Sequence, residues 1–256
     1  MATGVQPPVT GAQPFLSRPV TSGVMVETTH GGRKFRICGW RDDGLALADS
    51  ATHYGVVLDG TASLEGASGR FQLRSGMYFA QLNSASIGAA GRGRGRGRGR
   101  GLVISQDAYQ GLFHVGGPIE STGRLRYIDG CSDTLLISPA LRGDACLNLL
   151  HLPAGTHQTS HTHPSFRTGL VIAGHGTCRT DDGQYALEPG SVFFIEADVV
   201  HCFHTAAEPL LIVAFHPDSD FGPVDHDHPM VNRTLIDGIS ASRLSDAGRR
   251  QAGGNS

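Results

Sequence analysis

Residues 153–176 read PAGTHQTSHTHPSFRTGLVIAGHG, and residues 187–205 read LEPGSVFFIEADVVHCFHT. In the first stretch, His161 and His163 are two positions apart. On a β-strand such a pair projects both imidazoles to one face, about 6–7 Å apart along the chain, so both rings can reach a single ion. The second stretch begins a strand, turns, and brings His201 onto the next strand. The spacing predicts one site built from these three histidines.

Histidine is concentrated in this half of the chain. Ten of the 13 histidines fall between His151 and His228. Imidazole is the commonest metal ligand in proteins, and it changes charge near neutral pH. Three neutral imidazoles that meet inside a barrel suit Fe, Zn, Mn, Ni or Cu, and the ligand type alone does not choose among these metals.

The two stretches resemble the two sequence signatures of the cupin superfamily. The first signature is a Gly, five residues, His-x-His, three or four residues, Glu, six residues and a Gly. The second is a Gly, five residues, Pro-x-Gly, two residues and a His. The positions that fill the two patterns here are Gly155, His161, His163 and Gly174, then Gly190 and His201. The resemblance implies a β-barrel in which His161, His163 and His201 are the metal ligands.

Three positions depart from the family pattern. Arg167 occupies the slot of the family's Glu ligand, Glu196 replaces the Pro, and Asp198 replaces the second Gly. A divalent ion and a guanidinium about 6 Å apart would repel each other by about 5 kcal/mol at an effective dielectric near 20. Three arrangements avoid this repulsion. Arg167 could pair with Glu196 or another carboxylate, an anionic substrate could bridge the ion and the guanidinium, or the barrel could bind no metal and use its histidines to line an organic pocket.

The bridging arrangement favours an enzyme. Cupins such as gentisate and cysteine dioxygenases use three histidines and lack the acidic ligand. The resemblance therefore implies a mononuclear non-haem iron dioxygenase that binds Fe²⁺ and acts on a small carboxylate or phenolic metabolite. In this hypothesis Arg167 is the catalytic residue that clamps the substrate carboxylate, and His175, Tyr185 or His204 transfers protons. Two alternatives stay open: a non-catalytic small-molecule binding or sensor protein, and a metal-dependent isomerase or epimerase.

Short apolar runs bounded by Gly, Pro, Asp and Ser recur along the chain and predict an all-β fold. The clearest runs are Val24–Glu27, His53–Leu58, Met77–Leu82, Leu102–Ser105, Thr134–Ser138, Cys146–Leu152, Gly169–Ala173, Ser191–Ile195 and Leu210–Phe215. Only Ile239–Gln251 has a pattern compatible with a helix. The expected architecture is two cupin barrels (jelly-roll or double-stranded β-helix) in tandem.

The first half of the chain is expected to repeat the barrel without its site. Aligning Gly60 with Gly174 and Gly76 with Gly190 places the first half against the second. The four ligand slots then fall on Leu47, Asp49, His53 and Ile87. At most two of these side chains can bind an ion, so we interpret the first half as a degenerate structural barrel.

These patterns divide the chain into four segments. We expect a disordered N-terminal tail over 1–19, the degenerate barrel over 20–120, the metal-type barrel over 121–218, and a C-terminal arm and tail over 219–256. The first barrel contains GRGRGRGRGRG at 91–101. We interpret this tract as a disordered loop insertion rather than a tether for RNA, because no aromatic side chains interleave with its arginines.

The C-terminal segment offers two further hypotheses. Residues 216–229, HPDSDFGPVDHDHP, have the composition of a second metal site, but a solvated polar loop explains the Pro and Gly punctuation equally well. Residues 230–239 could form an arm across a neighbouring barrel, which suggests a homodimer by analogy with the fold alone.

Composition limits the partners and the compartment. The net charge of −2 provides no global basic field, so nucleic acid is disfavoured and a small-molecule substrate is expected. No stretch approaches the ~18 consecutive apolar residues of a membrane span, and the N-terminal sequence lacks the pattern of a secretory signal. The five cysteines are odd in number and form no CxxC pair, which favours a reducing, cytoplasmic location.

Overall fold

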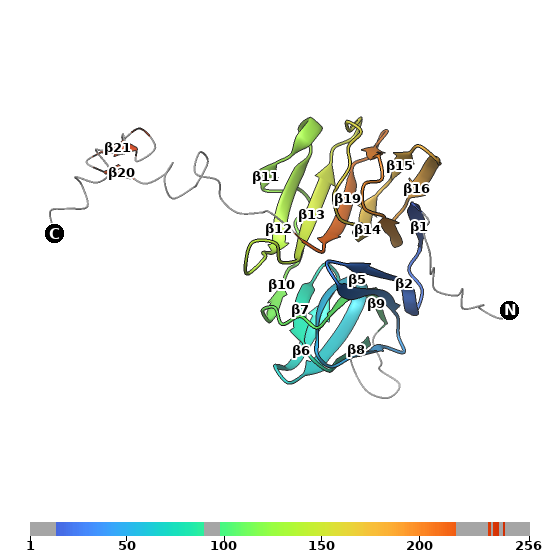
Figure 1. The fold of residues 1–256 in the computed structure, drawn as a ribbon, viewed down its shortest axis with the longest axis vertical. Coiled ribbons are helices and arrows are strands. Elements are labelled where there is room, and N and C mark those ends of the chain that lie inside the picture. The colour runs from blue at the N-terminus through green and yellow to red at the C-terminus, as the bar shows by residue number, and fades with distance from the viewer. Residues whose placement is uncertain (1–13, 90–97, 219–234, 237, 241–242, 244–256) are drawn as a thin grey trace. The chain divides into compact units, whose positions relative to one another are not determined.

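The computed structural model describes residues 14–89, 98–218, 235–236, 238–240 and 243 (Figure 1). Its regular structure over these residues is almost entirely β-strand, with one short 3-10 helix, η2, at Ile128–Gly130. The expected all-β fold class is therefore confirmed. No helix in these ranges is both long enough and apolar enough to cross a membrane.

Residues 14–218 form two groups of strands, which we call the N-terminal lobe and the C-terminal lobe. The N-terminal lobe contains β2 (Gly23–His30), β3 (Arg33–Trp40), β4 (Leu45–Leu47), β5 (Ala51–Gly66), β6 (Gly69–Arg74), β7 (Tyr78–Leu82), β8 (Ala85–Ala89), β9 (Gly99–Asp107) and β10 (His114–Gly116). The C-terminal lobe contains β1 (Phe15–Pro19), β11 (Leu125–Arg126), β12 (Ser132–Ile137), β13 (Cys146–Leu152), β14 (Arg167–Gly174), β15 (Gly176–Thr180), β16 (Gly183–Leu187), β17 (Ser191–Ile195), β18 (His201–His204) and β19 (Leu210–His216). All nine apolar runs of the sequence lie on these strands.

The strands of both lobes pair antiparallel. In the C-terminal lobe a seven-stranded sheet has the order β1-β17-β14-β19-β13-β12-β11, and a three-stranded sheet has the order β16-β15-β18. In the N-terminal lobe the order is β10-β7-β5-β9-β3-β2, while β6 and β8 also pair with β5 and β4 pairs with β8. The long strand β5 has 16 residues and belongs to both parts of the lobe. Its residues 51–60 pair with β9, and its residues 62–66 pair with β8. Two such sheet systems are compatible with two barrels in tandem.

The two lobes repeat the same local geometry, as the glycine alignment predicts. Gly60 and Gly174 have φ values of +78° and +73°, and a Cβ at either position would lie 1.7 Å from a carbonyl oxygen of the neighbouring strand. Only glycine combines this backbone conformation with such a close approach. Gly76 and Gly190 also share a positive φ, at +77° and +88°.

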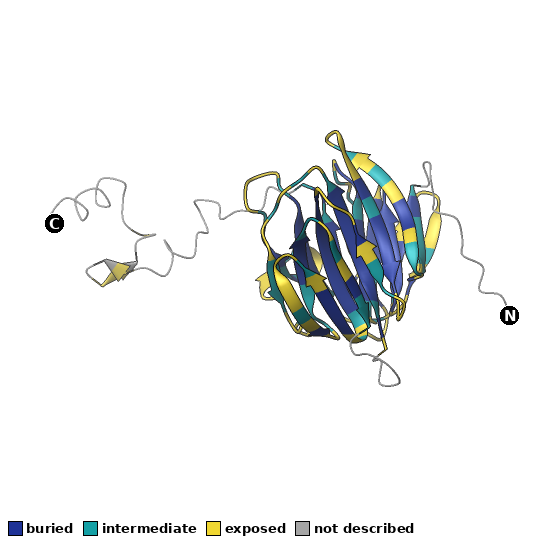
Figure 2. Ribbon diagram, turned by 90° about the horizontal axis from the view of Figure 1, so that it is seen from below, coloured by how far each residue is buried: buried dark blue, intermediate teal, exposed yellow. Residues whose placement is uncertain are grey.

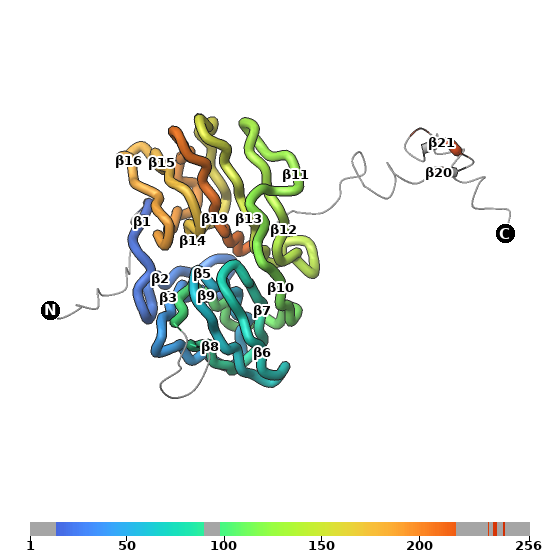
Figure 3. The backbone as a smooth tube through the Cα atoms, turned by 180° about the vertical axis from the view of Figure 1, so that it is seen from behind, coloured from blue at the N-terminus to red at the C-terminus, as the bar shows by residue number. Residues whose placement is uncertain are grey.

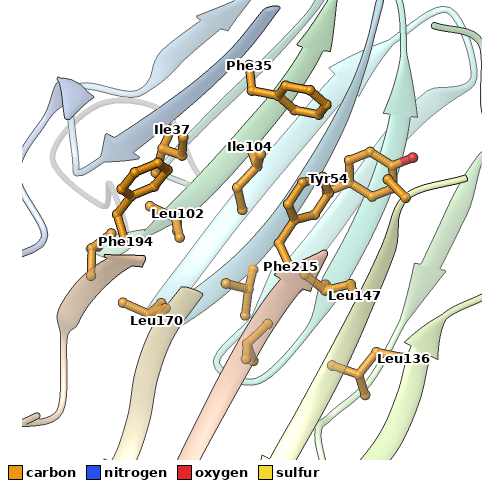
Figure 4. Close-up of a cluster of buried hydrophobic side chains, with 14 of the residues drawn as sticks. Phe35, Ile37, Tyr54, Leu102, Ile104, Leu136, Leu147, Leu170, Phe194 and Phe215 are labelled. Atoms are coloured by element: carbon orange, nitrogen blue, oxygen red, sulfur yellow. The ribbon is translucent and has the colours of Figure 1, made fainter. Parts of the chain in front are cut away.

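The lobes pack against each other through one shared hydrophobic core. Figure 4 shows part of this core, where Phe35 and Tyr54 of the N-terminal lobe lie near Phe215 of the C-terminal lobe. Phe166 of the C-terminal lobe belongs to the same cluster. Ring centroids of Phe35 and Phe166 lie 5.1 Å apart, as do those of Tyr54 and Phe215. Each lobe also has an interior core of its own, and Figure 2 shows the buried positions running along the strands while turns and hairpin ends are exposed.

Two of the expected unstructured segments contain strand residues. Residues 15–19, within the expected tail, form β1, which pairs with β17 at the edge of the C-terminal lobe and lies beside β16 (Figure 3). Residues 99–101 of the Gly/Arg tract begin β9 and pair with β5. Arg100 forms an ion pair with Asp59 of β5 (2.6 Å). The backbone at Gly101 lies so close to β5 that a Cβ there would be 2.0 Å from the carbonyl oxygen of Val56. The loop interpretation is wrong for this end of the tract.

The chain from Asp220 onward forms a separate unit. Its described part is a small hairpin of β20 (Leu235–Ile236) and β21 (Ile239–Ser240). Two residues at the start of the expected helix are therefore in a strand. The remainder of that helix, most of the proposed arm and the DHDH segment lie outside the described residues. The domain boundaries at 20, 121 and 219 remain predictions.

Candidate metal centre

A backbone bridge places two of the three predicted histidines side by side. The N–H of His161 donates to the carbonyl of His201, and the N–H of His201 donates back, both at 3.0 Å. His163 follows in a loop fixed by its own carbonyl, which accepts a hydrogen bond from the N–H of Asp198 (2.8 Å). The sequence predicts that His161 and His163 share a regular strand. The structure has only an isolated bridge at His161, but the rings still converge.

The three rings face one another closely. Their centroids lie 4.6 Å apart for His161 and His201, 4.9 Å for His161 and His163, and 5.2 Å for His163 and His201. One ring nitrogen of each side chain lies within 4.8 Å of a ring nitrogen of the others. Among the described residues, this is the only group of three or more His, Cys, Asp or Glu side chains close enough together to hold a metal ion.

Backbone carbonyls fix the tautomer of two of the rings. Nδ1 of His161 lies 2.8 Å from the carbonyl oxygen of Thr159, and Nδ1 of His201 lies 2.8 Å from that of Val199. A carbonyl only accepts, so both Nδ1 atoms carry a proton, and Nε2 is the atom of each ring that can bind a metal. Histidine ligands in metal sites are commonly oriented by such a hydrogen bond from the second nitrogen.

Burial also holds the rings of His163 and His201 neutral. Burial, with smaller contributions from the charges of Arg167, His201 and His161, lowers the pKa of His163 to about 3. Burial also lowers the pKa of His201 to about 4, although its hydrogen bond to Val199 acts in the opposite direction. A neutral imidazole is the form that binds metal. The donor set therefore fits a divalent transition-metal ion.

Arg167 begins β14 and points its guanidinium toward a serine rather than a carboxylate. Its Nη1 donates to the Oγ of Ser165 (2.5 Å) and to the carbonyl oxygens of Ser165 (3.2 Å) and Phe166 (3.0 Å). The Ser165 hydroxyl in turn donates to Oδ1 of Asp218 (2.5 Å). Burial lowers the pKa of Arg167, and the negative charge of Asp218 opposes that shift. The carboxylate associated with Arg167 is thus Asp218, whereas Glu196 lines a different cleft.

The histidines and Arg167 line one small cavity. Its volume is about 40 Å³, far below the ~300 Å³ at the lower end of ordinary ligand pockets. The Nε atom of Arg167 is buried there without a hydrogen-bond partner among the described residues. The other lining residues are Tyr127, Leu150, Gln158, Phe193, Ile195, Phe203, Ala214 and His216. The cavity has room for an ion and a few small molecules, so a larger ligand requires the walls to move.

His216 is a cavity residue that the sequence interpretation missed. Its ring lies 6.5 Å from that of His163, and burial lowers its pKa well below the usual value. A signal was available in the sequence. Ile212 and Ala214 have the same parity on β19 as His216, and both belong to the interior core.

The expected proton-transfer candidates lie outside the cavity. His175 is exposed and pairs with Glu208 (2.8 Å), while Tyr185 packs on Phe15 at the edge of the lobe. Nδ1 of His204 lies 2.9 Å from Nδ1 of His157 on the opposite face of β18 from His201. None of these residues lines the cavity, so the structure does not bring them to the three histidines.

The corresponding positions of the N-terminal lobe form no comparable group. Leu47 and Ile87 are buried in the interior core, and Asp49 is exposed. His53, in the slot equivalent to Arg167, is fully buried and hydrogen-bonded to the Ser105 hydroxyl (2.8 Å) and the Ala48 carbonyl (2.9 Å). A satisfied structural histidine explains this position.

Comparison with known proteins relates part of this chain to one family. Residues 148–216 match the family described as the cupin domain. This match covers the part of the chain that contains the three histidines, and solved cupin structures share the fold. No curated protein sequence matches the chain.

Several solved structures share the fold at low sequence identity. A putative glyoxylate-induced protein from Pseudomonas aeruginosa is 15% identical with a TM-score of 0.57, covering 86% of this chain and 96% of its own. A cupin 2 conserved barrel domain protein from Leptotrichia buccalis is 11% identical with a TM-score of 0.54, covering 81% and 91%. A salicylate 1,2-dioxygenase from Pseudaminobacter salicylatoxidans is 9% identical with a TM-score of 0.51, covering 75% of each chain. At these identities the likeness shows the fold alone.

Proposed function

We propose that this chain is a metal-dependent cupin enzyme, a mononuclear non-haem iron dioxygenase that acts on a small carboxylate or phenolic metabolite. One observation carries the proposal: three imidazoles with convergent ring nitrogens share a cavity with a buried guanidinium. Three protein ligands leave coordination positions open for small molecules. A ferrous ion held there would supply the redox chemistry that activates dioxygen.

The protein side chains have distinct roles in this proposal. His161, His163 and His201 hold the ion through their ring nitrogens, and burial keeps those of His163 and His201 unprotonated. Arg167 binds the substrate carboxylate, because the buried Nε donates to no described residue and an arginine fork matches a carboxylate. Phe193, Ile195 and Phe203, together with the other apolar walls, exclude water from the reacting groups.

The small cavity adds a requirement to the proposal. A substrate larger than a few heavy atoms enters only when the walls open, because the space is about 40 Å³. Tyr127 and Gln158 are the polar wall residues contributed by segments outside the regular strands, and we expect them to move. Another structure of the salicylate dioxygenase neighbour is a complex with gentisate, which makes aromatic hydroxy acids the first compounds to test.

The first test is elemental analysis of the purified protein and of a His161→Ala/His163→Ala double variant. Roughly one iron per chain, lost in the double variant but retained in His157→Ala, is the expected result. Oxygen uptake would then be screened with salicylate, gentisate and small aliphatic carboxylates. One zinc or nickel per chain, with no oxygen uptake, would instead favour an isomerase, an epimerase or hydrolytic chemistry.

A non-catalytic binding or sensor protein is the second candidate. The observation that favours it is Arg167 itself, since a guanidinium in place of a carboxylate ligand is the change expected after loss of a metal. Absence of any metal after reconstitution with Fe²⁺, Mn²⁺ or Zn²⁺, together with binding of a carboxylate, would support this candidate and exclude the enzyme.

We further propose the tandem-barrel division of the chain, a homodimer and a cytoplasmic location. The repeated glycine geometry supports the first. All five cysteines are buried and no disulfide joins any two of them, which supports a reducing compartment. Equilibrium sedimentation tests the dimer.

A further inference from the structure

A chain of hydrogen bonds connects the cavity to the N-terminal lobe. Arg167 donates to Ser165, and Ser165 donates to Oδ1 of Asp218, each at 2.5 Å. The other carboxylate oxygen of Asp218 lies 3.0 Å from Nε2 of His30, on β2. Ser165 is fully buried, so water does not replace the contacts that its hydroxyl makes, whereas the side chains of His30 and Asp218 are 28% and 37% exposed. Four side chains from three parts of the chain therefore form one line of hydrogen bonds.

This line of hydrogen bonds bears on the electrostatic repulsion between Arg167 and a metal ion bound by the three histidines. A divalent ion held by three neutral histidines keeps its full charge, and a nearby guanidinium raises its energy because few screening molecules intervene. In cupins with the Glu ligand, that carboxylate offsets part of the charge. Here the nearest described carboxylate connected to Arg167 is Asp218, two residues beyond β19.

We infer that Asp218, held between His30 and Ser165, is a positioning residue that offsets the charge of Arg167 and allows the guanidinium and a divalent ion to share one barrel. The N-terminal lobe thereby takes part in the site through His30, although it holds no metal group of its own. The part of this inference that concerns metal binding rests on the proposed function, whereas the part that concerns anion binding does not. Asp218 touches neither, and acts through Ser165 and Arg167.

The test uses the full chain, freed of metal, with Co²⁺ and formate as separate probes. Asp218→Asn keeps the shape and removes the charge. We expect Co²⁺ affinity to fall by about tenfold or more and formate affinity to rise, because the uncompensated guanidinium repels cations and attracts anions. Adding Arg167→Gln to Asp218→Asn should restore Co²⁺ binding and abolish formate binding. Asp182→Asn, at the exposed turn between β15 and β16, is the matched control and should change neither affinity.

Opposite shifts for the two probes separate charge balance from simple loss of structure. If both affinities fall in Asp218→Asn, or if neither changes, the inference is overturned. Should that variant fail to fold, Ser165→Ala and His30→Gln break the same line at other points and must shift the two probes in opposite directions. A wild-type chain that binds no Co²⁺ contradicts the proposed function, while the formate measurements still decide the role of Asp218.

Discussion

At the scale of single residues, we expect the charge at position 167 to determine what the cavity binds. A guanidinium beside three imidazoles should make the site more attractive to anions and less attractive to cations than the ligand set alone would be. The hydrogen bonds from Nη1 to Ser165 and Phe166 hold the side chain in one orientation. Arg167 is thus oriented before any ligand enters.

Replacing Arg167 by Gln tests this description directly. We expect the KM for an anionic substrate to rise by about 10–100-fold, because a charge-assisted hydrogen bond contributes roughly 1.5–3 kcal/mol. Metal affinity should rise, since the repulsive charge is gone. Arg179→Gln, on the exposed face of β15, is the control. Steady-state kinetics and metal titration of both variants provide the measurement, and an unchanged KM would exclude Arg167 as the substrate anchor.

His53 predicts a specific pH dependence of stability. Burial lowers its pKa in the folded chain below the ordinary value near 6.5. Below pH 6.5 the unfolded chain therefore binds a proton that the folded chain does not, and stability is lost as the pH falls from 6.5 toward the folded pKa. Above pH 6.5 this contribution is constant. Other buried histidines act in the same direction, so a variant is needed to isolate His53.

The comparison is between wild type, His53→Gln and the exposed control His175→Gln. Urea midpoints measured from pH 8 to pH 5 should fall less steeply for His53→Gln than for the other two proteins. Parallel curves for all three would show that His53 is not held neutral by the fold.

At the scale of elements, the pairing of β14 with β19 depends on one glycine at its end. Gly174 combines φ = +73° with an approach that leaves no room for a Cβ, which would lie 1.7 Å from the carbonyl oxygen of Pro209. Gly155 has nearly the same φ, +74°, but a Cβ there would meet nothing within 4 Å. The two positions separate backbone strain from steric overlap.

Alanine should therefore lower the free energy of unfolding by a different amount at each of these two positions. Gly155→Ala is expected to lower the free energy of unfolding by about 1–2 kcal/mol from the left-handed backbone alone. Gly174→Ala should lower it by roughly 3 kcal/mol or more, because the strands must also move apart. Urea denaturation of both variants gives the values. Equal losses of unfolding free energy in the two variants would mean that β14 and β19 move apart at Gly174 without any further cost in free energy.

Local patterns carry most of the element-scale information in this sequence. Ser191–Ile195 is an apolar run between a Pro-Gly turn and a polar loop, and it coincides with β17. β1 was not predictable in the same way, because its pairing with β17 joins residues about 175 positions apart and its sequence, FLSRP, is short and contains a proline. The start of β9 inside the Gly/Arg tract was hidden because a glycine repeat is typical of a loop.

The same distinction between local patterns and long-range contacts applies to the candidate site. The histidine spacing predicted the grouping of His161, His163 and His201, because a two-residue step and a signature length are local properties. The line from Arg167 through Ser165 to Asp218 and His30 was beyond sequence reasoning, since His30 and Asp218 are 188 positions apart. Only the packing of the two lobes brings them together.

At the scale of the whole molecule, the shared core makes the two lobes one folding unit. Phe215 of β19 is fully buried and contacts aromatic rings of both lobes: those of Phe35 and Tyr54 on one side and Phe166 on the other. Separating the lobes would expose this cluster to water. The N-terminal lobe therefore stabilises the C-terminal lobe, even though the residues at its own four ligand positions form no metal-binding group.

Phe215→Ala should destabilise both lobes together. Truncating a buried phenylalanine costs about 3–5 kcal/mol, whereas the control Leu141→Ala, whose side chain is 73% exposed, should stay within about 0.5 kcal/mol of wild type. Trp40 is the single tryptophan and is buried in the N-terminal lobe, so its fluorescence reports that lobe alone. We expect the Trp40 urea midpoint to fall in Phe215→Ala and to coincide with the circular dichroism midpoint. An unchanged Trp40 midpoint beside an earlier circular dichroism transition would show that the lobes unfold independently, and the coupling of His30 to the site would then lose its structural basis.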